Sequence, residues 1–551
     1  MKAWFRKVVA SGDLFIWGSG AGLAIALLMI IGLVALIGIN GLGFFWTPDV
    51  LELTLDDGTH VIGELTGSEQ IPNSVSAEHP HGQMRIRIKV GNRDLYGQDF
   101  RWIDNARIVT RTTPSDVVLL ERREWGNMYA RIQAIYKRDS PIVTGGDESW
   151  KTLLPLVDNA NLLHARIHHI ERDEIGHLSA ASERARLKIR KLELALPRGQ
   201  TLQKVDPERY ARLQAHIDDA EAQYGQHIDS LEKLYVDLDI YTAILIDSSG
   251  LETSLPIGKI IRALRPNSMS FSEKTWLYIV KVWEVLADEP REANTEGGLF
   301  PAIIGTVMMV LLTSIIVVPF GVITALYLGE YARQGVIVKI VRIAINNLAG
   351  VPSIVIGIFG LGFFIYAVGG TIDTFFFAET LPNPTFGTGG LLWAALTLAL
   401  LTVPVAIVAT EEGLAAVPRD YREASVGLGA TKFETIWRVV LPVAMPGILT
   451  GFILAIARAT GEVAPLMLTG VVKLAPDLPL DTTFPFVHLD RKFMHLGFHI
   501  YDVGFQSPNV EAAMPMIYVT TLVLLIIVVA LNLLAITLRQ RLRKKYAGAT
   551  V

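Results

Sequence analysis

Uninterrupted apolar runs alternate with a long polar stretch along this chain, and the first run lies at residues 15–45. It contains no charge from Leu23 to Ile39 and ends in Gly43-Phe44-Phe45-Trp46. A signal peptide has about 7 to 15 apolar residues before a small-residue cleavage site, whereas this run is longer and ends in aromatic residues. The pattern therefore predicts an uncleaved transmembrane helix.

Five further apolar runs are each long enough to cross about 30 Å of hydrocarbon. They lie at residues 301–328, 338–369, 390–410, 444–470 and 514–538. Internal prolines occur at Pro319, Pro352, Pro404 and Pro465. Proline inside a membrane helix frees backbone groups that need other partners, which suits a bundle of broken helices as well as a static bundle with kinks.

The short connections between the six predicted spans differ in basic charge. One side holds only Lys473, Arg491 and Lys492. The other side holds fifteen basic residues: Lys2, Arg6, Lys7, Arg333, Lys339, Arg342, Arg419, Arg422, Lys432, Arg438, Arg539, Arg541, Arg543, Lys544 and Lys545. Cytoplasmic loops carry the excess of Lys and Arg, so both termini are predicted to be cytoplasmic and residues 44–298 extracytoplasmic.

The polar stretch between the first two spans begins with short alternating runs. Leu51 to Leu55 and Arg85 to Val90 alternate apolar and polar residues, and Asp57-Gly58 and Gly91-Asn92 have the composition of turns. Alternation of this kind favours half-buried strands, so residues 51–112 are predicted to form a small β-rich module. Strand-like runs return at 240–270, and residues 272–287 are expected to be helical.

A helical hairpin is predicted at about 155–240, between the strand-rich parts. Apolar residues recur there mostly every three or four positions, first at Leu163, Ile167, Ile170, Leu178, Ala181, Ala185, Ile189, Leu192 and Leu196, then at Leu213, Ile217, Ala220, Tyr224, Leu231 and Leu238. Spacing of this kind is typical of helices that pack along one seam, here as a short antiparallel coiled coil.

The composition supports a chain with one part in the membrane and another part in water. Of 551 residues 51% are apolar and 19% charged, and residues 44–299 alone contain 31 Lys/Arg and 39 Asp/Glu. The length exceeds what one hydrophobic core supports. A net charge of -4 offers no basic field for nucleic acid, and the lack of cysteine excludes disulfides, thiolate metal sites and a cysteine nucleophile.

Two histidine pairs are the nearest approach to a metal site. His164 and His168, and likewise His495 and His499, are spaced one helical turn apart, which suits zinc. Neither pair has a third ligand at a diagnostic spacing, so all four are predicted to be solvated surface histidines. The polar stretch also lacks a nucleophile elbow, an H-E-x-x-H motif and a Gly-rich phosphate loop. We therefore expect no catalytic residue, metal or cofactor.

The loop between the fourth and fifth spans carries the most specific motif. It reads Glu423-Ala424-Ser425-Val426-Gly427-Leu428-Gly429, then nine residues, then Val439-Val440-Leu441-Pro442. This resembles the EAA loop of bacterial ABC importer permeases, E-A-A-x3-G-x9-I-x-L-P, with Ser425 in place of the second Ala and Val439 in place of Ile. The resemblance implies two short helices separated at the glycine, which dock on an ATPase subunit.

Each motif residue has an expected physical role within residues 411–443. Glu423 is expected near a helix start, where a carboxylate suits the dipole. Gly429 would permit a backbone conformation that larger residues avoid, and Pro442 would begin the next element. The chain has no G-x-x-x-x-G-K-[ST] motif, since Gly258-Lys259 is followed by Ile260. ATP hydrolysis is therefore assigned to a separate subunit.

Arg458 and Glu462 place two charges inside the fifth predicted span. They are four residues apart, so on one helix they share a face and can pair. Charges within a membrane span normally face a bundle interior or a pathway, and the guanidinium fork suits a tetrahedral oxyanion. The alternative is an ion pair that only fixes helix packing.

The sequence from Ala457 to Leu466 resembles the A-R-x-x-G-E-[TV]-A-P-L stretch of the PstA family, permeases of bacterial phosphate importers. Further matches are Tyr327-Leu328-Gly329-Glu330-Tyr331, Val351 to Gly357, and Asn294-Thr295-Glu296-Gly297-Gly298. PstC permeases typically continue with T-M-A, whereas Ala464-Pro465-Leu466 stands here. The resemblance covers roughly 1–43 and 290–551 but not 44–289.

The resemblance implies a type I ABC importer permease fold: an α-helical polytopic membrane protein with six spans, here with an α+β extracytoplasmic insertion. The expected domains are 1–43, 44–298 and 299–551. The implied function is ATP-driven phosphate import without bond chemistry in this chain. A PstC-like permease, a PstB-like ATPase dimer, a PstS-like phosphate-binding protein and membrane lipid are the implied partners. The alternatives are a permease for sulfate or molybdate, and a membrane-anchored sensor whose insertion binds a ligand.

Overall fold

Six helices in the computed structural model are long and apolar enough to cross a membrane. The structure describes residues 13–71, 83–507 and 510–547, so Lys2, Arg6 and Lys7 of the predicted basic side lie outside the described residues. The six candidate spans are Phe15–Gly43, Phe300–Tyr331, Ser353–Phe376, Leu391–Ala415, Lys432–Gly461 and Val510–Arg541. The predicted fold class, a polytopic helical membrane protein with an α+β insertion that contains a helical hairpin, is confirmed.

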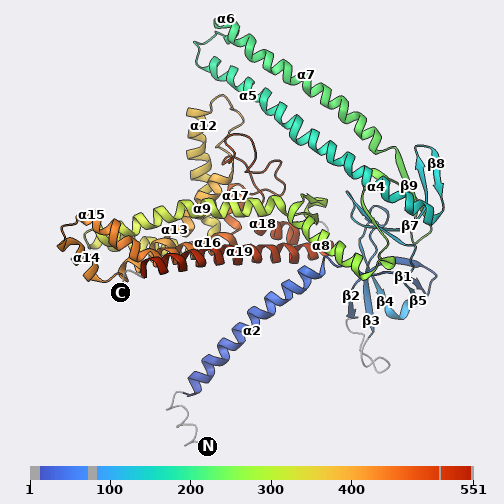
Figure 1. Cartoon of the computed structure of the whole chain (residues 1–551), viewed down its shortest axis with the longest axis horizontal. Helices are drawn as coiled ribbons and strands as arrows, with labels where there is room; N and C mark the ends of the chain where they lie inside the picture. Colours follow the sequence, from blue (N-terminus) through green and yellow to red (C-terminus); the bar gives the residue numbers. More distant parts are fainter. Residues whose placement is uncertain (1–12, 72–82, 508–509, 548–551) are drawn as a thin grey trace, which may run out of the picture.

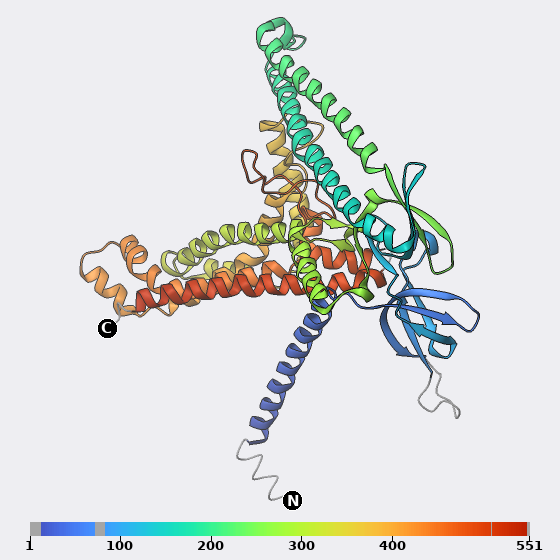
Figure 2. The same cartoon turned by 45° about the vertical axis from the view of Figure 1, so that its right-hand side comes forward.

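Four long helices lie alongside one another and form the bundle (Figure 1). They are α9 (Phe300–Leu326), α13 (Leu391–Ala415), α16 (Leu441–Gly461) and α19 (Val510–Ala547). Buried apolar side chains such as Met309, Leu398 and Ile456 form their common core. The first span, α2 (Asp13–Gly43), meets α19 where Gly41 faces Leu522, and diverges from the bundle towards its N-terminal end (Figures 1 and 2).

Two predicted spans are broken, and the predicted bounds are wrong there. The run at 338–369 divides into α10 (Val336–Leu348) and a helix that starts at Ser353 and continues to Phe376. Pro352 lacks an N–H and disfavours helix in the preceding residue, which separates the two. The run at 444–470 breaks at Glu462, whose φ of -88° and ψ of 130° are extended. Pro319 and Pro404, by contrast, lie inside continuous helices.

The remaining elements of the core are short. Along the chain they are η6 (Tyr327–Tyr331), α11 (Ser353–Phe359), η7 (Gly360–Gly369), α12 (Gly370–Phe376), α14 (Arg419–Gly427), α15 (Lys432–Thr435), η8 (Ile436–Val440), α17 (Ala464–Thr469), α18 (Leu496–Tyr501) and η9 (Asp502–Gln506). The elements η6, η7, η8 and η9 are π-helical turns or segments that continue a neighbouring helix.

The insertion begins with a five-stranded antiparallel sheet in the order β4-β3-β2-β1-β5. Its strands are β1 (Val50–Leu55), β2 (His60–Gln70), β3 (Met84–Lys89), β4 (Phe100–Asp104) and β5 (Ile108–Thr112). Alternate residues such as Leu53 and Ile88 are fully buried, because successive side chains of a strand point to opposite faces. The short elements α3 (Arg93–Tyr96) and η1 (Asn105–Arg107) flank β4.

A second sheet has the order β10-β9-β7-β6-β11, and β8 also pairs with β7. The strands are β6 (Val118–Arg122), β7 (Met128–Lys137), β8 (Ser140–Thr144), β9 (Tyr241–Ile246), β10 (Glu252–Pro256) and β11 (Ile260–Leu264), with η3 (Ile257–Lys259) and η4 (Pro266–Ser268) beside β11. Its core is continuous with the base of the helical hairpin, where Leu153 and Val157 are buried against Ile135 and Leu245.

The hairpin consists of a long first arm and a second arm that returns to the sheet. The first arm is α4 (Gly146–His169), the π turn η2 (Ile170–Glu174) and α5 (Ile175–Leu194); α6 (Leu202–Val205) follows, and α7 (Pro207–Leu238) is the second arm. The predicted seam is confirmed in part, since Ile170, Ala185, Ile217 and Leu231 are buried whereas Tyr224 is 44% exposed.

Helix α8 (Phe271–Ala287) connects the insertion to the bundle. The small strands β12 (Pro290–Arg291) and β13 (Glu296–Gly297), with η5 (Glu292–Asn294), lead from α8 into α9. Val285 of α8 is buried with Phe45, Leu299, Met494 and Met516, so the end of α2, the insertion and the bundle share one core at this junction.

The two ends of the bundle carry different structures. α14, α15 and the C-terminal end of α19 lie at one end, whereas both sheets lie beyond the other end (Figure 1). The hairpin passes from the second sheet back over α12 (Figures 1 and 2). There Lys191 Nζ of α5 lies 2.7 Å from Oε1 of Glu379, in the segment that follows α12. This ion pair joins the hairpin directly to the membrane core.

Candidate functional site

The EAA-like loop folds as two short helices that meet at a glycine. Pro418 precedes α14, and Leu428 ends it. Gly429 has φ +87°, in the left-handed region that residues with a Cβ rarely adopt. Thr431 then caps α15 by accepting from the N–H of Glu434 at 3.3 Å, while the N–H of Thr431 donates to Glu434 Oε2 at 3.0 Å. The glycine and the cap together fix a sharp change of direction.

The position expected for Glu423 within this loop is wrong. Glu423 is the fifth residue of α14, so it lies beyond the first turn, and Asp420 is the acidic residue at the helix start. Pro442 lies in the first turn of α16, as expected, although α15, η8 and α16 follow one another without a break from Lys432 to Gly461.

Polar contacts hold the loop against the end of α9. Arg422 Nη2 lies 3.0 Å from Oε1 of Glu330 in η6, and the same guanidinium donates to the carbonyls of Val417 and Leu414 at 2.6 and 2.9 Å. Lys432 donates to the carbonyl of Glu330 as well. The hydroxyls of Ser425 and Thr435 are 2.9 Å apart and join α14 to α15. These contacts join the loop to the end of α9, and α15 continues through η8 into α16.

The outer face of the loop is apolar and uncovered. Leu428 is 90% exposed, Phe433 64% and Trp437 60%, and the two rings stack with centroids 6.2 Å apart. Ala424 and Gly429 are also exposed, while Leu441 packs into the bundle core. Glu423 is exposed and makes no ion pair among the described residues. Exposed aromatic residues beside an unpaired carboxylate are suited to burial in another protein's groove.

Arg458 and Glu462 come together although they do not share one helix. Arg458 lies in the last turn of α16, and Glu462 follows its end. Arg458 Nε is 3.9 Å from Glu462 Oε1, a loose ion pair between side chains that are 32% and 22% exposed. Within the described residues Nε is buried without a hydrogen-bond partner. A buried donor left without a partner costs free energy.

The expectation of surface histidines is wrong for His495 and His499, which are 1% and 2% exposed. Residue Leu496 between them donates its N–H to Thr306 of α9 at 2.9 Å, and His499 Nδ1 lies 3.2 Å from Thr520 Oγ1 of α19. Helices α9 and α19 therefore cover α18 on both sides. Burial lowers the pKa of both histidines to about 4.

Other polar groups surround this buried pair. Lys473 Nζ lies 3.1 Å from Oδ2 of Asp502, which is 2% exposed, and Asn294 donates to the carbonyl of Lys473 at 3.0 Å.

The other histidine pair lies in the hairpin. His168 is exposed as expected, but His164 is partly buried and its Nε2 lies 3.1 Å from the carbonyl of Gly258. The described residues contain no group of three or more His, Cys, Asp or Glu suited to a metal ion.

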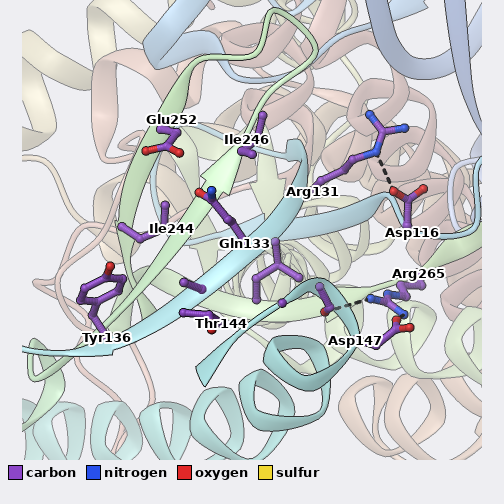
Figure 3. A pocket seen from close by; sticks show the side chains of 14 residues that line it. Asp116, Arg131, Gln133, Tyr136, Thr144, Asp147, Ile244, Ile246, Glu252 and Arg265 are labelled. Carbon is purple, nitrogen blue, oxygen red and sulfur yellow. Dashed lines mark hydrogen bonds and ion pairs between the residues drawn. The ribbon is translucent and has the colours of Figure 1, made fainter. Parts of the chain in front are cut away.

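A hollow of about 690 Å³ lies on the second sheet of the insertion (Figure 3). Its two guanidinium groups are already paired: Arg131 Nε lies 2.7 Å from Oδ2 of Asp116, and Arg265 Nη1 lies 2.8 Å from Oδ1 of Asp147. Glu252 adds a third carboxylate to the lining. This lining has no excess of cations for an oxyanion.

Three features of the site were not found from the sequence: Glu330 as the partner of the loop, the Phe433/Trp437 stack, and the Lys191–Glu379 contact. The four-residue spacing of Phe433 and Trp437 was the available signal, since it places both rings on one helix face. The other two contacts join residues that are 92 and 188 positions apart, and neither has a local pattern.

Comparison with known proteins places residues 317–548 in the family described as "Binding-protein-dependent transport system inner membrane component". The phosphate transport system permease protein PstA 1 of Mycobacterium tuberculosis H37Rv is 39% identical over 171 residues, which are 31% of this chain and 50% of that protein. The chain thus spans about half the length of this relative. The probable ABC transporter permease protein YqgI of Bacillus subtilis is 32% identical over 224 residues, 39% of this chain and 70% of that protein.

Among solved structures, the inward-facing MetNI methionine ABC transporter aligns with 50% of this chain and 99% of its own chain. The sequence identity is 19% and the TM-score is 0.32.

Proposed function

The chain belongs to the PstA-type permeases of binding-protein-dependent ABC transport systems, and from this premise we propose that it is the membrane subunit of an ATP-driven phosphate importer. The observation that carries the substrate is the 39% identity to a phosphate permease, together with Arg458 and its unsatisfied donor. Phosphate uptake tests the proposal, in cells that lack their own importer and receive this chain with its partners. Uptake no greater than with an empty vector would contradict it.

The proposed partner of the loop end is an ATPase dimer similar to PstB. The uncovered face of Leu428, Phe433 and Trp437 would be buried in a groove of that ATPase, and Glu423 offers a charge for orientation. Movement of the docked loop would reach α9 through Arg422 and Glu330. This assignment places the loop and both termini in the cytoplasm and residues 44–298 on the other side of the membrane, in agreement with the distribution of basic residues.

The proposed pathway runs between this chain and a PstC-like permease, and Arg458 lines it. Phosphate would accept hydrogen bonds from the guanidinium of Arg458, whose side chain is 32% exposed. Glu462, 3.9 Å away, would limit how tightly the anion is held, because two negative groups compete for one guanidinium. A carrier needs such a balance, since a substrate bound too tightly would not leave.

Sulfate and molybdate share the tetrahedral geometry of phosphate, so a permease for either is the first alternative. Competition distinguishes the three. For a phosphate permease, an excess of unlabelled sulfate or molybdate leaves the uptake of labelled phosphate unchanged. If unlabelled sulfate inhibited the uptake of labelled phosphate at concentrations as low as unlabelled phosphate does, the chain would be assigned to sulfate.

The second alternative is a sensor whose insertion binds a ligand. The hollow in Figure 3 would be the binding site, but both of its guanidinium groups are paired with carboxylates. Copurification separates the two functions, because an importer subunit is isolated with an ATPase. A chain that is never recovered with an ATPase subunit under conditions that preserve the membrane complex would favour the sensor.

For the insertion, we propose contact with a PstS-like binding protein or with the PstC-like permease. The distal part of the hairpin, residues 184–216, carries nine Lys/Arg and three Asp/Glu. A groove of about 410 Å³ between its arms is lined by Lys188, Lys191, Arg209 and Arg212, among others. Such a surface attracts an acidic partner and steers its approach.

Charge reversal tests this contact in the complete transporter. Lys188→Glu combined with Arg209→Glu is expected to weaken association with the binding protein or to loosen the complex with PstC. Lys233→Glu, at an exposed position in the proximal part of α7, is the control. Unchanged affinity for the binding protein and unchanged complex stability in the double variant, or after deletion of 51–285, would refute the contact.

A further inference from the structure

Helix α8 is amphipathic in an unusual way, because its exposed face is the apolar one. Trp276 and Trp283 are each 69% exposed, Ile279 is 53% exposed and Leu286 39%. These residues follow one another at intervals of three or four, so they line one face of the helix. Ser272 and Ala287 share this face, which contains no charged residue. Soluble proteins rarely leave such an uncharged aromatic face in water.

Every charged side chain of α8 is engaged elsewhere. Glu273 forms the capping box with Ser270. Lys274 pairs with Asp49 at 2.5 Å, Lys281 with Glu121 at 2.9 Å, and Glu284 with Arg262. The partners Glu121 and Arg262 lie in the second sheet, and Leu277 and Val285 are buried. The helix thus turns Lys274, Lys281 and Glu284 and its buried apolar side to the protein, and its aromatic face is open.

Both ends of α8 adjoin the ends of membrane spans. At its start the ring of Phe271 lies 5.7 Å from the ring of Trp46, three residues beyond α2. At its end the carbonyl of Val285 accepts from the N–H of Leu299, directly before α9, at 2.7 Å. α8 therefore lies between the end of one candidate span and the start of the next (Figure 1).

We infer that the aromatic face of α8 is a lipid-binding surface that lies in the interface of the membrane leaflet nearest the insertion. Tryptophan is enriched at this depth because its ring is apolar and its N–H reaches water. An amphipathic helix there buries its apolar face among headgroups and the first acyl carbons. The ion pairs of α8 to the second sheet then hold the insertion at a fixed height above the bilayer. The inference rests on α2 and α9 crossing the membrane and not on the transported substrate.

The test uses spin labels, since the chain contains no native cysteine. Trp276→Cys and Trp283→Cys are labelled with a nitroxide in the complete transporter in lipid nanodiscs, and accessibility to oxygen and to a water-soluble nickel chelate is measured. Leu28→Cys in α2 provides the membrane reference, and Gln226→Cys, exposed on α7, the aqueous one. For both α8 labels, the ratio of accessibility to oxygen over accessibility to the nickel chelate is expected to be several-fold higher than for the Gln226 label.

Two results would overturn the inference. Labels at positions 276 and 283 that match the Gln226 label would place the face in water, and labels shielded from both reagents would show that a protein subunit covers it. Because cysteine substitution can disturb folding, quenching by lipids brominated in the upper acyl chain provides a second measurement. Trp276→Phe with Trp283→Phe is expected to lower the quenched share of the fluorescence, and an unchanged share contradicts lipid contact.

Discussion

Arg422 and Glu330 form the bond that connects the EAA-like loop to the first helix of the bundle core. Their Nη2 and Oε1 atoms are 3.0 Å apart, and the side chains are only 26% and 18% exposed. The loop and α9 are separated by about ninety residues of sequence, and this pair and the contact of Lys432 with the Glu330 carbonyl are polar links between them. Ala325 of α9 adds apolar packing against Val417 and Val440. A hydrogen bond to a charged group at a partly buried site contributes about 1.5 to 3 kcal/mol.

Glu330→Gln is therefore expected to reduce phosphate uptake several-fold while the complex still assembles. The amide keeps the shape of the side chain but removes the charge that holds Arg422, so loop movement would reach α9 less fully. Uptake and ATPase activity of the purified complex are measured together, since loss of uptake with retained ATPase activity indicates uncoupling. Arg419→Gln, at an exposed position in α14, the helix of Arg422, is the control. Full coupling in Glu330→Gln would show that this bond transmits nothing.

Gly429→Ala is expected to impair the loop through the backbone alone. A Cβ at this position meets nothing within 4 Å, but φ +87° costs an alanine about 1 to 2 kcal/mol. Gly427→Ala is a matched control, because it too has open space and lies in the helix, where alanine is favoured. We expect Gly429→Ala to bind the ATPase subunit more weakly. We expect Gly427→Ala to leave this affinity unchanged or to raise it slightly. Equal affinities would exclude a role for the left-handed turn.

Arg458→Ala is expected to abolish phosphate uptake and to leave the assembly of the complex intact. Arg458→Lys keeps the charge but not the fork, so it should retain a small part of the activity if the guanidinium binds the anion directly. An ion pair that only fixes helix packing predicts the reverse pattern, with a less stable complex and transport in proportion to its amount. Uptake is therefore normalised to the assembled complex. Undiminished transport by Arg458→Ala would end the proposed role.

Local periodicity explains why much of the architecture could be predicted from the sequence. Apolar residues that recur every three or four positions, among them Ile170, Ala185 and Ile217, indicate the helix faces along which the two arms pack. The alternation of apolar and polar residues around Leu53 and Ile88 indicates strands. These patterns depend on neighbours within one element. They were sufficient for the hairpin, the first sheet and the six apolar spans.

Contacts between distant elements explain what could not be predicted. A hydropathy average treats 338–369 as one run, because Gly350 and Pro352 change the backbone and not the polarity. His495 and His499 have the spacing of a surface helix, and only the positions of α9 and α19 bury them. The pairing of Arg458 with Glu462 was predicted, but the helix end between them was not, because the apolar run from 444 to 470 does not reveal it.

Lys191→Met is expected to weaken the contact between the hairpin and the membrane core. The lysine is 62% exposed and its partner Glu379 12% exposed, so the ion pair contributes well under about 1 kcal/mol, and global stability should not change measurably. The local effect is measured by amide hydrogen exchange, which should rise in residues 377–383 and in the distal part of α5. Lys188→Met, one turn away, is the control. Equal exchange in both variants would mean that the contact does not restrain the hairpin.

Acid is expected to destabilise the end of the bundle that contains His495 and His499. Burial lowers the pKa of each to about 4, whereas an unfolded histidine titrates near 6.5, so the folded state favours the neutral rings. The stability that this supplies is complete above pH 6.5 and is lost as the pH falls towards 4, by about 2 to 3 kcal/mol per ring. Asp502 opposes this shift at His499, and Lys473 adds to it.

The variants that test this effect keep the local hydrogen bonds. His495 Nδ1 accepts from the N–H of Gly497 at 3.1 Å as a helix cap, and His495→Asn preserves an acceptor there. Combined with His499→Gln, it should flatten the fall of the melting temperature between pH 6.5 and 4.5, whereas His177→Gln on exposed α5 should not. Burial raises the pKa of Glu64 and Glu296, so their contribution has the opposite sign and is the same in every variant. A fall that remains as steep in the double variant would assign the acid sensitivity to other groups.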